Sequence, residues 1–163
     1  MTVGGAVIRA MTSKDISAVT AMERDIFPDP WTEDMFREAL ILSKSVNLVV
    51  ADGDGSLCGY LCAQAVADEI QIHNVAVATT HRRQGIGRAL LEYAEKQGSD
   101  NGAVCAVLEV RITNTAALAM YGQMGYRRIG RRRAYYRKPV CDALVLLKVF
   151  DGAPAEETKQ DVS

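Results

Sequence analysis

The 163-residue sequence predicts a single α/β domain with one mixed, mostly antiparallel sheet of about seven strands and helices on both faces. Two observations lead to this fold class. Three strand-like segments joined by short links follow two amphipathic helices, which is typical of an antiparallel meander. The hydrophobic period then changes to that of a helix, and a nearly continuous apolar run follows, which predicts a βαβ crossover with one parallel strand pair.

The first part of the chain is expected to form a strand and two helices. Val7–Ala10 is a short apolar strand candidate. Thr12, with Asp15 three residues later, matches a capping box at the start of the first helix. Thr32 caps the second helix, after a proline-rich break. The stripe of the first helix that faces the core is expected to carry Ile16, Val19, Thr20, Met22, Glu23, Ile26 and Phe27.

The next three segments read as the strands of the meander. Asn47–Ala51 and Leu57–Ala67 are separated by Asp-Gly-Asp-Gly, a strong turn signal. Glu69–Val77 follows after a single aspartate. This third strand is expected to place three side chains on one face of the sheet: Ile70, Ile72 and Asn74.

The second half of the chain alternates helices and strands. A helical period begins at Gly85, and Gly98 is expected just past the end of that helix. Ala103–Val110 is a nearly continuous apolar run, as a strand covered on both faces should be. Asn114 opens a further helix that stops near Gly125. The last strands form an antiparallel pair: Tyr126–Tyr136 and Cys141–Phe150.

Composition and length describe one ordinary globular domain over residues 1–150, with a polar tail over residues 151–163 that is expected to be disordered. A formal net charge of −1 gives no reason to expect direct nucleic-acid binding. No apolar run reaches the roughly 18 residues of a membrane span, and no signal-peptide pattern is seen. We therefore expect a cytoplasmic monomer or weak oligomer with no membrane partner.

Cysteine and histidine usage argues against a metal site. The four cysteines lie in apolar segments without a CxxC pair, so we expect reduced core residues. The two histidines show no ligand spacing, so no metal is expected. Positive charge is concentrated in two arginine clusters. The first comprises Arg82, Arg83 and Arg88. The second, to which no role is assigned, comprises Arg127, Arg128, Arg131, Arg132 and Arg133.

Residues 81–88, His-Arg-Arg-Gln-Gly-Ile-Gly-Arg, have the features of a phosphate-binding turn. Glycines allow a sharp turn, and the free N–H groups at a helix N-terminus favour an anion. The flanking arginines add charge for a diphosphate. The segment matches neither the nucleotide P-loop nor the dinucleotide fingerprint. Taken alone, it is explained equally well as a basic helix start with a glycine turn.

Arg82-x-x-Gly85-x-Gly87 resembles the acetyl-CoA pyrophosphate motif of the GNAT acetyltransferases. The resemblance extends over residues 7–148 and implies the GNAT fold, acetyl-CoA as cosubstrate and acetyl transfer to an amine. It rests on three further segments, which resemble the fourth strand, the fifth strand and the following helix of that superfamily: Asn74–Val77, Leu108–Arg111, and Asn114 with Ala117 and Tyr121-x-x-x-Gly125-Tyr126.

Finer features resemble the RimI-type ribosomal-protein alanine N-acetyltransferases and their protein N-terminal relatives. Phe27-Pro28 with Pro30-Trp31-Thr32 resembles their FPW[ST] segment, and Tyr135-Tyr136 followed by Asp142-Ala143 resembles their closing motif. The resemblance implies that the acceptor is the N-terminal alanine of a small-subunit ribosomal protein. Two alternatives remain open: a GNAT enzyme acting on a small amine or internal lysine, and a non-catalytic acetyl-CoA-binding module.

The resemblance also implies two catalytic residues. Glu109, at the end of an apolar strand, would be the general base. From the residues alone, a strand-end charge paired with Arg111 or another arginine is the competing interpretation. Tyr121 would be the general acid for the departing thiolate, although its place on an apolar stripe fits core packing too. Direct attack by the amine is expected, because no cysteine or serine is placed beside a base.

Further residues are assigned to cofactor and acceptor. Asn114 serves equally well as a helix N-cap. The aromatic residues Trp31, Tyr135 and Tyr136 are expected to line the peptide groove, with core packing as the alternative. His73 departs from the RimI-type pattern, and we expect a structural role. The cofactor-binding residues that the resemblance implies are Val75, Ala76, Val77, Arg83, Gln84, Gly85, Ile86, Gly87, Arg88 and Asn114.

Overall fold

The computed structural model describes residues 1–152, so nearly all of the predicted tail at 151–163 lies outside the described residues. Short 3-10 helices, η1 (Ser13–Asp15) and η2 (Thr79–His81), precede α1 and α3. The other elements, in chain order, are β1 (Thr2–Val3), β2 (Ala6–Ala10), α1 (Ile16–Ile26), α2 (Glu33–Ile41), β3 (Ser45–Ala51), β4 (Leu57–Val66), β5 (Glu69–Val77), α3 (Ile86–Asp100), β6 (Cys105–Arg111), α4 (Thr115–Gln123), β7 (Arg127–Arg137) and β8 (Val140–Val149).

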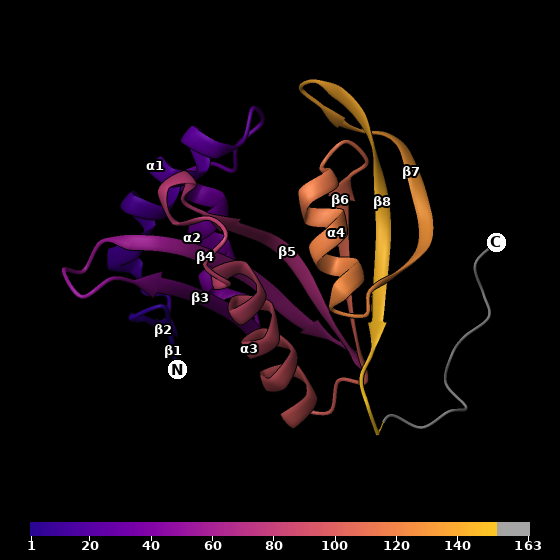
Figure 1. The fold of residues 1–163 in the computed structure, drawn as a ribbon, viewed down its shortest axis with the longest axis horizontal. Helices are drawn as coiled ribbons and strands as arrows, with labels where there is room; N and C mark the ends of the chain where they lie inside the picture. Colours follow the sequence, from indigo (N-terminus) through magenta and orange to yellow (C-terminus); the bar gives the residue numbers. More distant parts are fainter. Residues whose placement is uncertain (153–163) are drawn as a thin grey trace.

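The strands form one mixed sheet in the order β1-β2-β3-β4-β5-β6-β8-β7 (Figure 1). Among the described strands, only β5 and β6 pair in parallel, so the predicted meander and βαβ crossover are both confirmed. The described sheet has eight strands rather than about seven. The additional strand, Thr2–Val3, folds back on β2 through Gly4 and Gly5, and two residues are too few to show a strand period.

Helices cover both faces of the sheet, as predicted. One hydrophobic cluster joins α1 and α2 to the sheet through residues such as Val19, Phe36 and Tyr60. A larger cluster joins α3 and α4 to the opposite face through residues such as Leu90, Leu91 and Met124. All four cysteines are free, and Cys58, Cys62 and Cys141 are buried.

A β-bulge in β5 reverses the faces of its last residues. Ile72 pairs with Ala63 and Asn74 pairs with Cys62, so His73 is an extra residue opposite β4. The prediction that Ile70, Ile72 and Asn74 share one face is therefore wrong for Asn74. Its amide points toward α1, whereas Ile70 and Ile72 belong to the cluster beneath α3.

Gly98 does not follow α3 but lies inside it, which corrects the predicted helix end. A Cβ atom at Gly98 would lie 3.1 Å from the side chain of Ile70, so the missing side chain allows close contact between helix and strand. The chain leaves α3 instead near Gly102, which has a φ of +97°. The other predicted caps are confirmed. Thr32 accepts a hydrogen bond from Met35 N–H, and Asn114 accepts one from Ala117 N–H.

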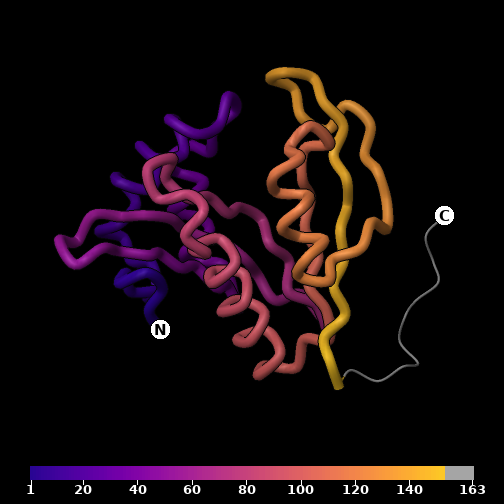
Figure 2. The backbone as a smooth tube through the Cα atoms, viewed as in Figure 1, coloured from indigo at the N-terminus to yellow at the C-terminus, as the bar shows by residue number. Residues whose placement is uncertain are grey.

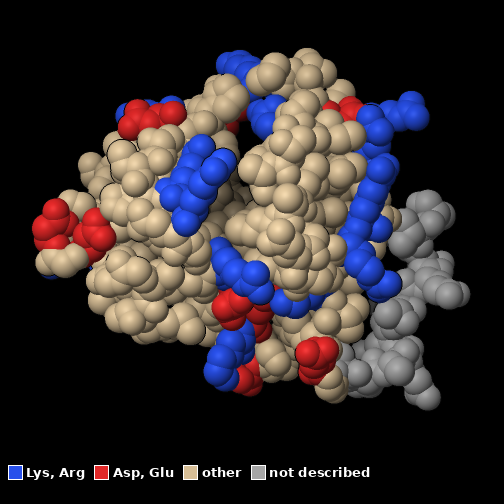
Figure 3. Space-filling model, in the orientation of Figure 1, with Lys and Arg blue, Asp and Glu red and all other residues tan. Residues whose placement is uncertain are grey.

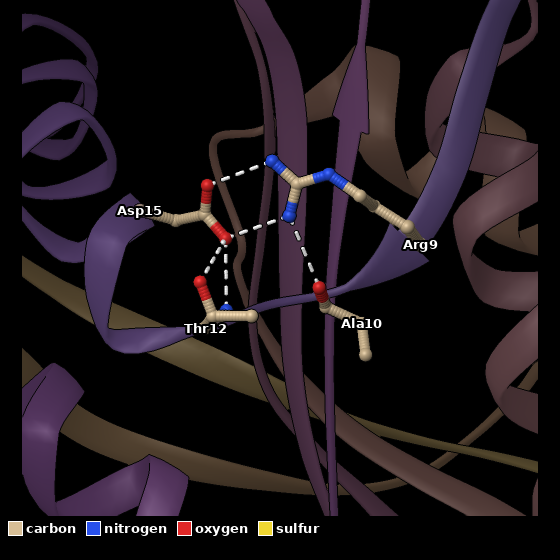
Figure 4. Close-up of polar contacts among 4 residues, drawn as sticks. All are labelled: Arg9, Ala10, Thr12 and Asp15. Atoms are coloured by element: carbon tan, nitrogen blue, oxygen red, sulfur yellow. Dashed lines mark hydrogen bonds and ion pairs between the residues drawn. The ribbon is translucent and has the colours of Figure 1, made fainter.

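The predicted capping box at Thr12 is confirmed and extended by an arginine (Figure 4). The Asp15 carboxylate accepts a hydrogen bond from Thr12 N–H at 2.8 Å. It also accepts two from the Arg9 guanidinium, each at 2.8 Å. Hydrogen bonding to Arg9 holds the pKa of Asp15 below its ordinary value of 3.8. This group fixes the start of α1 against β2.

Replacing Asp15 with asparagine should lower the free energy of unfolding by about 1–2 kcal/mol at neutral pH. Because the pKa of Asp15 is lowered in the folded state, its stabilisation is present above the ordinary carboxyl pKa and is lost as pH falls through the lowered value. Urea unfolding from neutral pH into the acid range should show the two proteins converging. Asp100→Asn, at an exposed pair with Lys96, is the control; an equal loss there would contradict the prediction.

Candidate active site

The sheet opens where β5 and β6 separate, and the candidate site lies in that opening. The parallel pairing joins Glu69–Ile72 to Cys105–Leu108 and continues no further within the described residues. Beyond it the two strands diverge, which Figures 1 and 2 show as a V between β5 and β6. His73 is the first residue of β5 that no longer pairs with β6, and Glu109 is the first residue of β6 that no longer pairs with β5. The bulge at His73 is a local reason for the strands to part.

Two neighbouring cavities lie at this opening and beside it. The smaller, of about 170 Å³, contains both predicted catalytic residues, Glu109 and Tyr121. The larger, of about 820 Å³, extends toward β7 and shares Glu109 and Trp31 with the first. The fold therefore brings the carboxylate and the phenol to one hollow, which β5 and the α1–α2 connection also line.

Glu109 is not a lone carboxylate. Its Oε1 lies 2.8 Å from Arg132 Nε of β7, and its side chain is 25% exposed. Hydrogen bonding to Glu109 also raises the pKa of Tyr135 above its ordinary value. The arginine partner considered as the competing interpretation is thus present, but it is Arg132 and not Arg111. Arg111 instead donates to the carbonyls of Lys138 and Pro139 and covers the ring of Tyr136.

Tyr121 is a buried side chain on α4 that reaches the smaller cavity. Its ring packs against Tyr126 with centroids 5.6 Å apart. Burial raises the pKa of Tyr121 to about 12, so its hydroxyl remains protonated at neutral pH. Core packing and access to the cavity are therefore combined in one residue, and its chemical state suits a proton donor.

Glu23 of α1 was not predicted as a site residue, yet it also lines the smaller cavity. It is 2% exposed and accepts hydrogen bonds from the Tyr60 hydroxyl, the Asn74 amide and Trp31 N–H. Burial, followed by the Glu23 charge, raises the pKa of Tyr60 far above its ordinary value. The sequence signal for this residue is a carboxylate placed within the apolar stripe of a helix.

The predicted phosphate turn has the expected geometry at the surface. Gly85 caps α3 with a φ of +79°, and Arg83 before it has a φ of +63°. Within residues 1–152, the N–H groups of residues 84–88 have no recorded hydrogen-bond acceptor, which leaves them available to an anion. Figure 3 shows basic side chains at this loop beside the central hollow. The loop itself lines neither of the two cavities.

Between this loop and the cavity runs the free edge of β5. Val75, Ala76 and Val77 pair with β4 on one side, while pairing with β6 has already ended. Their outer backbone groups therefore face the opening. Gly87 lies close to this edge, because a Cβ there would meet Val77 at 3.4 Å. Asn114 lines the smaller cavity in addition to capping α4.

The aromatic residues predicted for the peptide groove lie around the larger cavity. Trp31 and Tyr136 line both cavities, and Tyr135 lines the larger one. Trp31 also packs on Phe36, with ring centroids 5.1 Å apart, so groove and core contacts coexist. His73 lines both cavities as well. Loss of surrounding water lowers the pKa of His73, while the charge of Glu109 opposes that shift.

A cysteine does lie beside a histidine, contrary to the premise used for direct attack. The Cys58 sulfur, a ring nitrogen of His81 and a carboxylate oxygen of Asp52 lie within 4.8 Å of one another, at the start of the phosphate turn. Both ring nitrogens of His81 are engaged, one with Asp52 and one with Thr80, each at 2.9 Å. Cys58 is fully buried, and burial raises its pKa to about 11. This thiol is protonated and lines neither cavity, so it is poorly suited as a nucleophile.

The second arginine cluster lies on β7, the outer strand of the sheet. Figure 3 shows its basic side chains as a stripe along that edge. Arg131 pairs with Asp142, and Arg132 pairs with Glu109. Charge along an outer strand also discourages pairing with other sheets. Over residues 1–152, none of the helices combines the length and apolarity needed to cross a bilayer.

Comparisons with known proteins agree with this architecture. The family model described as the acetyltransferase (GNAT) family matches residues 16–126. The putative [ribosomal protein bS18]-alanine N-acetyltransferase of Bacillus subtilis is 33% identical over 141 residues, covering 86% of this chain and 93% of the relative. The N-alpha-acetyltransferase RimI of Mycobacterium tuberculosis is 34% identical over 145 residues, covering 85% and 89%.

A solved structure gives the same result in three dimensions. The ribosomal-protein-S18-alanine N-acetyltransferase from Escherichia coli superposes with a TM-score of 0.83 at 29% identity, covering 93% of this chain and 97% of that one. The family match spans more than half of the chain, and the relatives are aligned over most of their length. The chain belongs to the GNAT acetyltransferase family and is an N-acetyltransferase of the RimI type.

Proposed function

We propose that this enzyme transfers the acetyl group of acetyl-CoA to the α-amine of a protein N-terminus, with the N-terminal alanine of a bS18-like ribosomal protein as its principal acceptor. The observation that carries the proposal is the shared cavity of Glu109 and Tyr121, which lies where β5 and β6 part. The names of the relatives in Bacillus subtilis and Escherichia coli support the choice of acceptor.

The reaction needs a neutral amine, an attacked thioester carbonyl and a protonated leaving thiol. Glu109 takes a proton from the acceptor ammonium, and the amine lone pair then forms the bond to the acetyl carbon. Attack leaves an adduct with a negative oxygen and a nitrogen that still carries one extra proton. As the carbonyl re-forms, the carbon–sulfur bond breaks and the Tyr121 hydroxyl gives its proton to the departing sulfur. The nitrogen then passes its extra proton to the Tyr121 phenolate, and Glu109 releases its proton to solvent. An α-amino group has a pKa of roughly 7.7–8.0, against about 10.4 for lysine, so a modest base suffices for an N-terminal acceptor.

The chain's own residues provide a binding path for acetyl-CoA. The free N–H groups of residues 84–88 and the side chains of Arg83 and Arg88 suit the diphosphate. The open edge of Val75–Val77 suits the pantetheine amides, and a backbone N–H there is the candidate donor to the oxyanion. Asn114 is the candidate contact from α4. No step of this scheme calls for a metal.

A panel of acceptors with a thiol-release assay and mass spectrometry tests the proposal. The panel holds an alanine-starting bS18 peptide with a free N-terminus, the same peptide blocked at its N-terminus, a peptide with an internal lysine, a polyamine and an aminoglycoside. Acetylation of the free peptide alone would support the proposal. Acetylation of the small amines without the peptide would overturn the choice of acceptor. Tight acetyl-CoA binding without thiol release would overturn catalysis.

Replacing Gly85 with valine should raise the KM for acetyl-CoA by about tenfold, because a left-handed conformation costs a residue with a side chain about 1–2 kcal/mol. The added Cβ meets nothing within 4 Å, so the effect would come from the backbone and not from a clash. Gly55→Val is the matched control, with a φ of +88° and the same open surroundings in the β3–β4 turn. Equal KM values for both variants would refute the role of the turn.

In the cell, we propose that residues 1–150 act as a self-contained acetyltransferase domain in the cytoplasm, as a monomer or weak oligomer without a membrane or nucleic-acid partner. Mass spectrometry of protein N-termini from cells with and without this gene tests the acceptor directly. Loss of acetylation from one ribosomal protein is the expected result. Unchanged N-terminal acetylation throughout would contradict it.

A further inference from the structure

We propose that Glu23 is a positioning residue for the acceptor, holding the wall of the cavity that receives the incoming amine. This inference rests on the proposed function and adds a residue to it. Glu23 lines the same cavity as Glu109 and Tyr121, but it lies on α1, on the opposite face of the sheet from α4. It is one of few charged side chains buried in the described part of the chain.

The hydrogen bonds of Glu23 join three separate elements around the cavity. Its Oε1 accepts from Trp31 N–H at 3.2 Å, in the connection between α1 and α2. Both of its oxygens accept from Asn74 Nδ2 at 3.0 Å, in β5 directly after the bulge. Its Oε2 also accepts from the Tyr60 hydroxyl of β4. Glu23 thus connects the α1–α2 connection to β5, the strand that diverges from β6 to open the site.

The donor set requires a carboxylate. Every recorded partner of Glu23 donates a hydrogen bond to it, and an ionised carboxylate can only accept hydrogen bonds. No lysine, arginine or histidine within residues 1–152 forms a recorded ion pair with it. A buried charge without a cation is costly unless hydrogen bonds satisfy it fully, as they do here. Glutamine has the same shape, but its NH₂ group would face one of these donors.

The bulge explains why this arrangement bears on the acceptor. If β5 kept its regular alternation through His73, Asn74 would share the face of Ile72, point toward α3 and not reach Glu23. The contact between Glu23 and Asn74 therefore stabilises the bulged form of β5. Both residues bordering the bulge, Ile72 and Asn74, line the smaller cavity. A change at Glu23 should thus alter the cavity wall while leaving in place the phosphate turn, which follows β5 and lines neither cavity.

The experiment compares steady-state kinetics of the whole enzyme and of Glu23→Gln with an alanine-starting bS18 peptide, together with acetyl-CoA binding by calorimetry. We expect kcat/KM for the peptide to fall by at least about tenfold, while the acetyl-CoA affinity changes by less than about twofold. Glu23→Asp, which keeps the charge and shortens the side chain, should recover part of the loss. Wild-type peptide kinetics in Glu23→Gln would overturn the inference.

Glu95→Gln is the matched control for a general loss of stability. Glu95 is also buried and accepts from a tyrosine, Tyr126, but it pairs with Lys148 and lines neither cavity. This variant should be less stable and keep its peptide kinetics. An equal loss in Glu95→Gln would mean that Glu23 is merely structural.

Tyr60→Phe, which removes one hydrogen-bond donor to Glu23, replaces Glu23→Gln if that variant does not fold. Unchanged peptide kinetics in Tyr60→Phe would equally overturn the inference. If the wild-type enzyme itself leaves the peptide unmodified, it is the proposed function that fails.

Discussion

Replacing Glu109 with glutamine is expected to lower kcat for peptide acetylation at neutral pH by about 10²- to 10⁴-fold, the usual contribution of a general base. The loss should shrink as pH rises through the acceptor's pKa of roughly 7.7–8.0, because free amine then accumulates without help from the enzyme. The measurement is kcat and kcat/KM for an alanine-starting peptide over that pH range. A variant with wild-type rates at every pH would remove Glu109 from the mechanism.

The ion pair with Arg132 makes a control necessary. Glu109→Gln also leaves Arg132 without its partner, which could disturb β7. Arg132→Gln breaks the same contact from the other side and keeps the carboxylate. The Arg132 side chain is 58% exposed, so its replacement should cost little stability. If Arg132→Gln reproduces the full loss and the same pH dependence, the ion pair and not proton transfer explains the effect of Glu109.

The sequence predicted those features of the fold that depend on local patterns. The capping residues Thr12, Thr32 and Asn114 each lie where a hydroxyl or amide precedes a helical period, and each begins a helix or its 3-10 turn. The order of strands followed from short links and one change of period. β1 was missed because two residues carry no periodicity. Gly98 was misplaced because a glycine needed for helix–strand contact looks like a helix end in sequence.

The candidate site was harder to predict, because it depends on contacts between distant segments. The resemblance to RimI-type enzymes placed Glu109 and Tyr121 at one site, and both line one cavity. It did not indicate that Arg132 would be the partner of Glu109, since that pairing depends on the register of β7 against β8. Nor did it indicate the bulge at His73, because Ile70, Ile72 and Asn74 continue a regular alternation. Glu23 was missed because its partners lie in distant segments of the chain, namely the α1–α2 connection, β4 and β5.

Replacing Tyr121 with phenylalanine should lower kcat by about 10²-fold or more and leave acetyl-CoA binding nearly unchanged. The ring is buried and packs on Tyr126, so removing one oxygen keeps the packing while removing the proton donor. Because burial raises the pKa of Tyr121 to about 12, the wild-type enzyme should show no loss of rate from this residue between neutral pH and moderately alkaline conditions. Steady-state kinetics over pH, with calorimetric binding of acetyl-CoA, provide the measurement.

Tyr126→Phe separates loss of a proton donor from loss of a buried hydroxyl. Tyr126 packs against Tyr121, but its hydroxyl donates to Glu95 at 3.2 Å and lies away from both cavities. This control should lose stability, because a buried Glu95 oxygen loses a donor, and should keep its kcat. A replacement of CoA by a thiol of lower pKa adds a second comparison, since a better leaving group needs less protonation. If Tyr121→Phe is equally slow with both thiols, or if Tyr126→Phe is slowed as much, Tyr121 is not the general acid.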